Sequence, residues 1–154
     1  AIISGPVNSF NSQKRLVGIQ QALFEASIPY NVGTTVIGDW TRECGYHAAS
    51  QLLSQGVTAI YAFSDKMISG VYTYCIEHRI SVGKDISLFG FDDSDIVHAY
   101  TPPLASAKPD LQEMGHKAAE LVLAQLQGKT VCTKCHVLPC TIHVRPSVCS
   151  IGEA

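Results

Sequence analysis

The sequence has little charge and no excess of basic residues. Of its 154 residues, 16% are charged, and the formal net charge at pH 7 is −2. Because binding to nucleic-acid phosphates needs a clustered cationic surface, we expect this segment not to grip DNA by itself. Its 46% hydrophobic fraction suits one or two compact globular units.

Other features that would assign a class are also missing. The sequence shows no apolar run long enough to cross a bilayer and no basic-then-apolar signal pattern, so we expect no contact with a membrane. It contains no nucleophile elbow, Walker loop or G-x-G-x-x-G motif, and His98 has no serine or cysteine placed for activation. We therefore predict that it is not an enzyme and needs no cofactor. The chain opens directly on strand-like residues, "AIISGP", which predicts a piece of a longer protein.

Six cysteines are present, but a chain of this length can build a core without disulfides. Cys44 and Cys75 fall on apolar faces of predicted helices, where a free thiol behaves as a small hydrophobe. These positions favour a reducing, cytoplasmic setting.

The first hundred residues repeat one order of signals, an apolar strand followed by an amphipathic helix. Thr41 and the pair Ser64-Asp65 are predicted to cap the second and third helices, and Gly56 to end the second. Such alternation predicts an α/β fold with a parallel sheet covered by helices on both faces. The predicted strands are 1–5, 31–39, 57–63 and 85–91, and the predicted helices are 12–27, 42–56 and 66–79.

Polar segments follow the predicted strands: "GPVNSFNS", "GDWTRE", "SDK" and "DDSD". In a parallel sheet, ligands bind outside the carboxyl ends of the strands. The apolar run Ile86–Phe91 stops at two aspartates, Asp92 and Asp93, and is expected to deliver them to this edge.

The pattern changes after residue 100. "TPPLASAKPD" holds three prolines, which predicts a linker to a different structural body and excludes a central strand. Residues 110–127 form a strong helix pattern ending near Gly128, with an apolar stripe that little in this chain would cover. "CHVLPCTIHVRPS" is predicted to supply a final β-rich piece.

Several blocks carry a family resemblance: "GDWTRECGYHAASQLL", "TAIYAFSDKMISGV", "DISLFGFDDSD", "TPPLASAKPDLQEMGHKAAELVLAQL" and "VLPCTIHVRPS". In order and spacing they resemble the LacI/GalR family of bacterial transcription regulators, whose two-lobed effector domain is similar to periplasmic binding proteins of type I. The chain departs from the family at Arg79, where a helix-ending glycine is usual.

The resemblance also divides the chain. It implies that residues 1–104 belong to the C-terminal lobe, 105–130 to a crossover strand and helix of the N-terminal lobe, and 131–154 to a return strand and tail. The rest of the N-terminal lobe and a helix-turn-helix head would lie outside this chain.

By resemblance, three residues bind the effector. Arg15 matches an arginine that points into the interlobe cleft, where a guanidinium offers five fixed donors. Asp92 matches an aspartate that accepts hydrogen bonds from the ligand. Trp40 stands where an aromatic ring stacks on the effector. From the residues alone, Arg15 is an ordinary solvated helix arginine, and Trp40 is equally well a core residue.

Four further residues fall at family contact positions. Ser64 and Asp65 face the cleft in the family, besides capping a helix. Ser9 and Asn11 lie on the first strand-to-helix loop. Asp93 is expected to structure its loop instead of touching the ligand.

A metal site is a further possibility in "CTKCHVLPC". Its Cys132, Cys135, His136 and Cys140 include C-x-x-C spacing, and zinc favours tetrahedral sulfur and nitrogen ligands. Such spacings arise readily in loops, so we expect no metal here.

The resemblance implies an effector-sensing domain of a transcription regulator. A small molecule, a sugar or a nucleobase-like compound, would bind between the lobes of a homodimer and change operator affinity through the head outside this chain. The alternative is a periplasmic sugar-binding protein that serves a transporter. Adjacent carboxylates also occur in glycoside hydrolases, but neighbouring residues point in different directions, so that interpretation is weak.

Overall fold

A mainly parallel sheet forms the centre of the protein. The computed structural model describes residues 1–129 and 135–150, and within them six strands pair in the order β2-β1-β3-β4-β5-β6. All neighbours are parallel except β5 and β6, which are antiparallel. The strands are β1 (Ile2–Ser4), β2 (Thr35–Ile37), β3 (Ala59–Ala62), β4 (Ser87–Phe91), β5 (Ala105–Pro109) and β6 (Cys140–His143).

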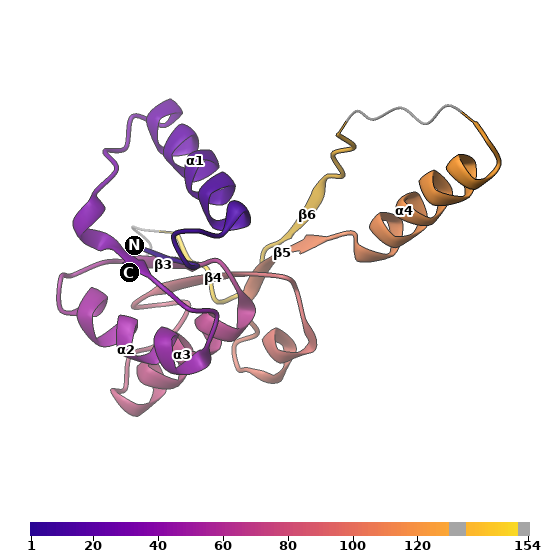
Figure 1. Cartoon of the computed structure of the whole chain (residues 1–154). Helices are drawn as coiled ribbons and strands as arrows, with labels where there is room; N and C mark the ends of the chain where they lie inside the picture. The colour runs from indigo at the N-terminus through magenta and orange to yellow at the C-terminus, as the bar shows by residue number, and fades with distance from the viewer. Residues whose placement is uncertain (130–134, 151–154) are drawn as a thin grey trace.

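Helices cover both faces of this sheet, as the sequence predicts. Helix α1 lies on one side, and α2 and α3 lie together on the other (Figure 1). The helices are α1 (Phe10–Glu25), α2 (Arg42–Leu53), α3 (Asp65–Glu77) and α4 (Leu111–Leu126), with short 3-10 turns η1 (Val32–Thr34) and η2 (Asp95–Ala99).

The core lies mainly between the sheet and the pair α2–α3. Helix α3 is buried along most of its length, and Met67, Ile68 and Val71 are fully buried. Glycines let the two helices approach closely: a Cβ at Gly45 would lie 1.9 Å from the Met67 carbonyl oxygen. This tight pair fixes the N-terminus of α3 at the carboxyl edge of the sheet.

The prediction of a linker at residues 101–110, which rests on the three prolines, is wrong: residues 105–109 are a strand inside the sheet. β5 pairs with β4 on one side and with β6 on the other. The three prolines do not prevent this, because Pro102 and Pro103 precede the strand and Pro109 is its last residue. The small residues between them leave their backbone free to pair, and Ala105, Ser106 and Ala107 are buried.

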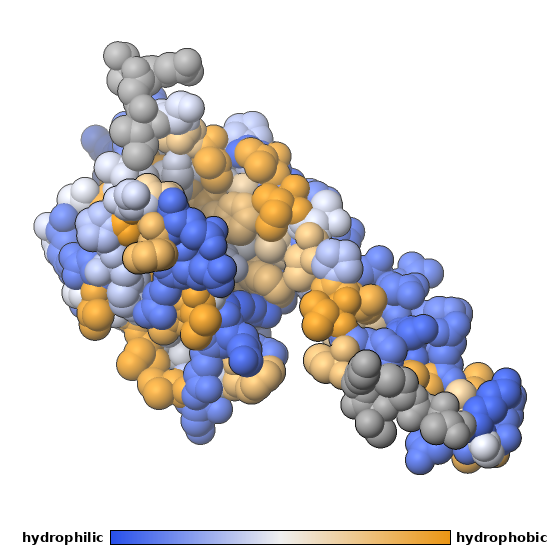
Figure 2. Space-filling view, turned by 90° about the horizontal axis from the view of Figure 1, so that it is seen from above, coloured by the Kyte–Doolittle hydropathy of each residue, from blue (hydrophilic) through white to orange (hydrophobic). Residues whose placement is uncertain are grey.

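Helix α4 stands apart from the sheet at the end of an arm that β5 and β6 begin (Figure 1). None of its residues is buried, so the predicted uncovered apolar stripe is confirmed. Figure 2 shows hydrophobic residues at the surface of this arm and at its junction with the sheet. The exposed apolar residues of α4 are Leu111, Met114, Val122, Leu123 and Leu126. No helix in the described ranges combines the length and hydrophobicity that a bilayer crossing demands.

Candidate functional site

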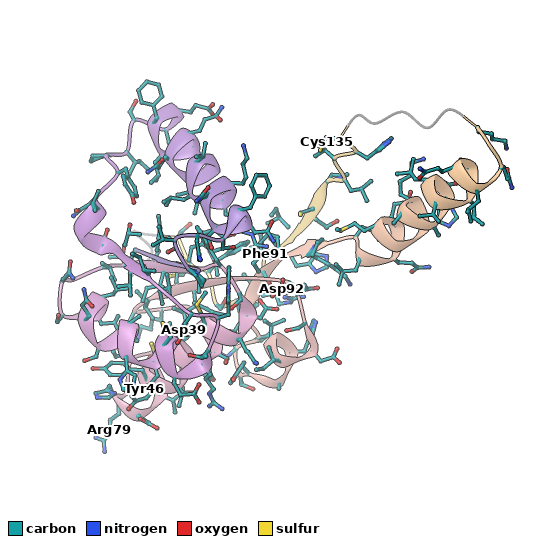
Figure 3. The ribbon with its side chains drawn as sticks, in the orientation of Figure 1. Asp39, Tyr46, Arg79, Phe91, Asp92 and Cys135 are labelled. Atoms are coloured by element: carbon teal, nitrogen blue, oxygen red, sulfur yellow. The ribbon has the colours of Figure 1, made fainter. Side chains whose placement is uncertain are left out.

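A cavity of about 720 Å³ opens at the carboxyl edge of the sheet. The end of β4, with Phe91 and Asp92, lies at this edge, close to where the arm leaves the sheet (Figure 3). Such a volume is in the usual range for small-molecule pockets. The structure brings six of the seven predicted site residues to this one pocket: Asn11, Arg15, Trp40, Ser64, Asp65 and Asp92.

Arg15 reaches the pocket from the second turn of α1. Its Nη1 donates a hydrogen bond to the carbonyl oxygen of Phe63 at 2.6 Å, and its guanidinium lies 3.5 Å from the centre of the Phe91 ring. Partial burial lowers the pKa of Arg15, although an arginine in a protein stays protonated. These two contacts hold a cation in a fixed place while leaving other guanidinium donors for a ligand.

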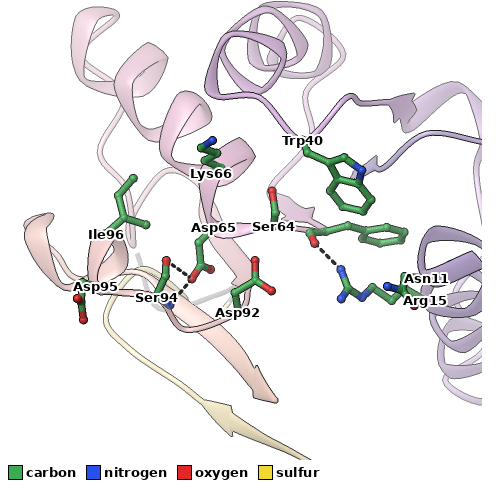
Figure 4. Close-up of a pocket in the computed structure, with 11 residues that line it drawn as sticks. Asn11, Arg15, Trp40, Ser64, Asp65, Lys66, Asp92, Ser94, Asp95 and Ile96 are labelled. Carbon is green, nitrogen blue, oxygen red and sulfur yellow. Dashed lines mark hydrogen bonds between the residues drawn. The ribbon is translucent and has the colours of Figure 1, made fainter. Parts of the chain in front are cut away.

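Asp92 is an acceptor that the pocket leaves available to a ligand. Within the described residues its carboxylate makes no hydrogen bond, and it points into the space between Asp65 and Arg15 (Figure 4). Burial and the nearby charge of Asp65 raise the pKa of Asp92, while the charge of Arg15 opposes this rise. Its backbone has φ 110°, a conformation that costs a non-glycine residue roughly 1–3 kcal/mol and that is typical of functional sites.

Ser64 and Asp65 divide the roles that the sequence assigns to them jointly. Ser64 alone caps α3, by accepting a hydrogen bond from the Met67 amide at 3.2 Å. Asp65, only 1% exposed, accepts hydrogen bonds from Ser94 and Ser106 instead. Burial raises the pKa of Asp65, and these hydrogen bonds oppose the rise. Asp65 therefore joins three segments at the wall of the pocket.

Trp40 combines the two roles that the sequence leaves open. It packs partly against the hydrophobic core and also lines the pocket. Its φ is 70°, which is a rare conformation for a bulky residue. Gly5 makes room for the ring: a Cβ at that position would lie 2.0 Å from Cζ2 of Trp40.

Ser9 is the predicted site residue that the structure does not place in the pocket. It caps α1 and accepts a hydrogen bond from the Ser12 amide at 3.4 Å. Helix α1 begins two residues earlier than predicted, so Asn11 lies on the helix and not on the preceding loop. This early start turns Asn11 towards the pocket (Figure 4).

Sequence reasoning missed several lining residues. Lys66 is in the first turn of α3, and Ser94, Asp95 and Ile96 follow β4. Their motifs, "SDK" and "DDSD", do stand at strand ends, which was the available signal. The charged residues lining the pocket are two cations, Arg15 and Lys66, and three carboxylates, Asp65, Asp92 and Asp95. The pocket thus offers both donors and acceptors, as a polyhydroxylated or heterocyclic ligand requires.

The structure describes only part of the cysteine-rich segment in which a metal site is possible. Cys132 lies outside the described residues, and Cys135, His136 and Cys140 all have exposed positions. Within residues 1–129 and 135–150, no three or more His, Cys, Asp or Glu residues gather as metal ligands would.

Comparisons with known proteins agree with this fold and pocket. The profile of the family described as periplasmic binding protein-like domain matches residues 1–148. The repressor CytR of Escherichia coli K12 is 33% identical over 147 residues, and the lactose operon repressor of the same strain is 31% identical over 133 residues. The chain spans 43% and 36% of their lengths, respectively, whereas 94% and 85% of the chain is aligned.

Solved structures extend the likeness to three dimensions. The regulator CelR in complex with cellobiose has a TM-score of 0.88 and 30% identity, over 96% of this chain and 46% of that chain. A lac repressor dimer bound to operator and the anti-inducer ONPF has a TM-score of 0.87 and 29% identity, over 97% of this chain and 52% of that chain. The chain belongs to the periplasmic binding protein-like domain family, in its LacI/GalR branch.

Proposed function

We propose that this chain is the effector-sensing part of a DNA-binding transcription regulator. The observation that carries the proposal is the pocket at the sheet edge, where the Arg15 guanidinium, the Trp40 ring and the Asp92 carboxylate meet. The ligand is a small polar molecule, a sugar or a nucleobase-like compound. The names of the relatives, which are repressors, favour a regulator over a transporter's binding protein.

The division of labour within the pocket follows from its chemistry. Asp92 accepts hydrogen bonds from ligand hydroxyl or N–H groups, Arg15 donates to ligand oxygens, and Trp40 covers an apolar ligand face. The lining described here contains no histidine or cysteine that would activate a nucleophile. The names of the relatives, which are repressors and not enzymes, favour binding without turnover.

We assign residues 1–104 to one lobe and residues 105–130 to the crossover into a second lobe, with a return strand in 131–154. The exposed apolar stripe of α4 supports this division, because a second lobe would cover it. A ligand between two lobes switches the protein only through its different affinities for their open and closed arrangements. In a cytoplasmic homodimer, that change would alter operator affinity through DNA-binding heads outside this chain.

Trp40 provides a direct test, because it is the protein's single tryptophan and it lines the pocket. We expect its fluorescence to change saturably on titration with one member of a panel of ribose, lactose, cellobiose, adenine and cytosine. Asp92→Ala should weaken that binding roughly 10- to 150-fold, because a charge-assisted hydrogen bond contributes about 1.5–3 kcal/mol.

Glu25→Ala is the matched control, since this carboxylate is exposed at the far end of α1. It should leave the affinity unchanged. An unaltered dissociation constant in Asp92→Ala would refute the role of Asp92, and silence of Trp40 towards the whole panel would count against a sugar or nucleobase effector.

A further inference from the structure

A cluster of basic residues surrounds a buried carboxylate, Asp93, which is the residue next to Asp92. The side chain of Asp93 is 3% exposed. Its Oδ1 lies 2.6 Å from Nη2 of Arg145, and its Oδ2 lies 2.8 Å from Nδ1 of His143. Lys108 is a third basic residue near Asp93, at 4.0 Å from Oδ2, with a side chain that is mostly in solvent. The two close partners come from the last strand and its extension, far along the chain from Asp93.

The loop that this cluster holds is conformationally unusual. Asp92 and Asp93 have φ angles of 110° and 51°, both in the region that favours glycine. Each amide of the loop also has a fixed acceptor: the Ala107 carbonyl oxygen for Asp92, the Ser106 hydroxyl for Asp93, and the Asp65 carboxylate for Ser94. A strained turn of this kind persists only when its surroundings determine it fully.

We propose that His143 and Arg145 are positioning residues for Asp92. By fixing Asp93 from behind, they set the direction in which the preceding residue presents its carboxylate to the pocket. These contacts hold Asp93 in a backbone conformation that glycine would adopt more easily. Arg145 is itself anchored, because its Nη1 donates to the Leu104 carbonyl oxygen at 2.7 Å.

The topology gives this contact a regulatory meaning. His143 lies on β6, opposite Ser106 of β5, and these two strands lead from the sheet to the arm that carries α4. A movement of the arm that shifts β6 against β4 changes the contacts of Asp93 and reorients Asp92. The contacts of Asp93 with His143 and Arg145, called the clamp below, therefore link the position of α4 to the orientation of Asp92 in the pocket. That meaning rests on the proposed function, but the clamp itself is a property of the ligand-free protein.

Backbone amide exchange of the ligand-free protein, followed by NMR, tests the clamp without any effector. His143→Leu replaces the hydrogen-bond donor by an apolar side chain that still fills space. We expect it to speed exchange at Asp92, Asp93 and Ser94 at least tenfold. His143→Asn places an amide N–H near the Nδ1 position and should restore rates to within threefold of the wild type. Lys108→Ala, the matched control for a distant and solvated cation, should also stay within threefold.

Amides of β3 and α3 report on the rest of the fold and should exchange as in the wild type in all three variants. Unchanged exchange at residues 92–94 in His143→Leu would overturn the proposal, as would equal acceleration in His143→Leu and His143→Asn, which indicates packing alone. If His143→Leu does not fold, Asp93→Asn is measured in its place. Exchange at residues 92–94 of Asp93→Asn that stays as slow as in the wild type would also overturn the proposal. Because no sugar is involved, failure of the clamp is distinct from failure of the pocket to bind one.

Discussion

Two residues of the pocket, Trp40 and Asp92, have left-handed backbones that neither side chain favours. Both follow strands at the edge where ligands bind in parallel sheets, so the strain is located where the proposed chemistry is. Neighbouring groups hold each residue in place: Gly5 admits the indole, and the Asp93 cluster fixes the turn at Asp92. At the residue scale, the site is therefore preorganised and does not depend on the ligand to form.

The protonation of Asp92 predicts how ligand binding depends on pH. Burial and the charge of Asp65 raise its pKa. Asp92 therefore becomes protonated at a higher pH than an ordinary aspartate, whose pKa is about 4. Affinity for a panel compound that binds should fall as pH is lowered through this raised pKa, because the protonated group loses acceptor capacity. Titrations of Trp40 fluorescence at a series of pH values measure this, and Asp92→Asn should show a flatter profile. A parallel decline in Asp92→Asn would assign the effect to another group, such as Asp65.

The loop behind Asp92 should survive this range of pH. Burial on its own raises the pKa of Asp93, but the ion pair with Arg145 and the hydrogen bond with His143 outweigh burial and lower it. A lowered carboxyl pKa contributes stability that is present above the unfolded-state pKa and is lost only as pH falls through the folded-state value. Loss of binding at the raised pKa of Asp92 therefore precedes any loss of the Asp93 cluster.

Gly5→Ala should damage the pocket by displacing Trp40. The added Cβ would lie 2.0 Å from Cζ2 of Trp40 and 2.4 Å from Oγ of Ser12, so the indole has to move. We expect unfolding free energy to fall by about 1–3 kcal/mol, as in other overpacked sites, with a red-shifted Trp40 emission. Gly18→Ala is the control: it has open space and lies inside α1, so it should stabilise by about 0.5–1 kcal/mol. Chemical denaturation and emission spectra compare the two, and equal stabilities would contradict the packing described here.

At the scale of elements, two helices end without the glycine that the sequence patterns favour. Helices α1 and α3 close with Ser27 and Arg79 in left-handed conformations, φ 57° and 59°. In α3 the Arg79 amide donates to the Ile76 carbonyl oxygen and the Ile80 amide to that of Cys75, which is the Schellman arrangement. Backbone hydrogen bonding thus dictates the turn, whatever residue occupies it.

Arg79→Gly should therefore stabilise the protein. A left-handed conformation costs an L-residue about 1–2 kcal/mol, and the substitution removes this cost. Glycine's greater freedom in the unfolded chain opposes the gain by about 0.5–1 kcal/mol. We expect a net gain near 0.5–1 kcal/mol in thermal or urea unfolding, with no change at the pocket, which lies far from Arg79 (Figure 3). Gln127→Gly, at a cap with φ −80°, should instead lower stability. A loss in Arg79→Gly similar to that of Gln127→Gly would rule out relief of strain.

The element order was predictable because strand and helix periodicities differ and the caps are explicit. Thr41 and Ser64 cap α2 and α3 as expected, and Gly56 and Gly128 follow helix ends with positive φ. β5 was not predictable by the proline rule, because that rule ignores where in the strand each proline falls. β5 accommodates Pro109 because this proline is its last residue, and the residues before Pro109 keep the amides that pair with the neighbouring strands.

At the scale of the whole molecule, the site was predictable only through the family resemblance. Periodicity places Asp92 and Trp40 at strand ends, but Arg15 lies within a helix, and only a family pattern selects it. The packing of Phe91 on Arg15 and the Asp93 cluster join segments more than 40 residues apart, and a single sequence carries no signal for such contacts. What remained hidden is therefore the support behind the ligand-binding groups.

Helix α4 gives the prediction that belongs to the whole molecule. Leu123 of α4 is 56% exposed, whereas Leu52 of α2 is fully buried. In the 154-residue chain, Leu52→Ala should therefore cost about 2–5 kcal/mol of unfolding free energy, but Leu123→Ala less than about 0.5 kcal/mol. Urea unfolding measures both with the same chemical change.

The same pair of variants tests the assignment of α4 to a second lobe. If a second lobe covers the apolar stripe, Leu123→Ala acquires a core-like cost of about 2 kcal/mol or more once that lobe is present. The comparison is made in a fusion that carries a family N-terminal lobe, such as that of CytR, upstream of Ala1. A cost for Leu123→Ala that stays near zero in the longer protein would show that α4 projects into solvent there too. No second lobe would then move the arm, and the clamp at Asp93 would have no regulatory role.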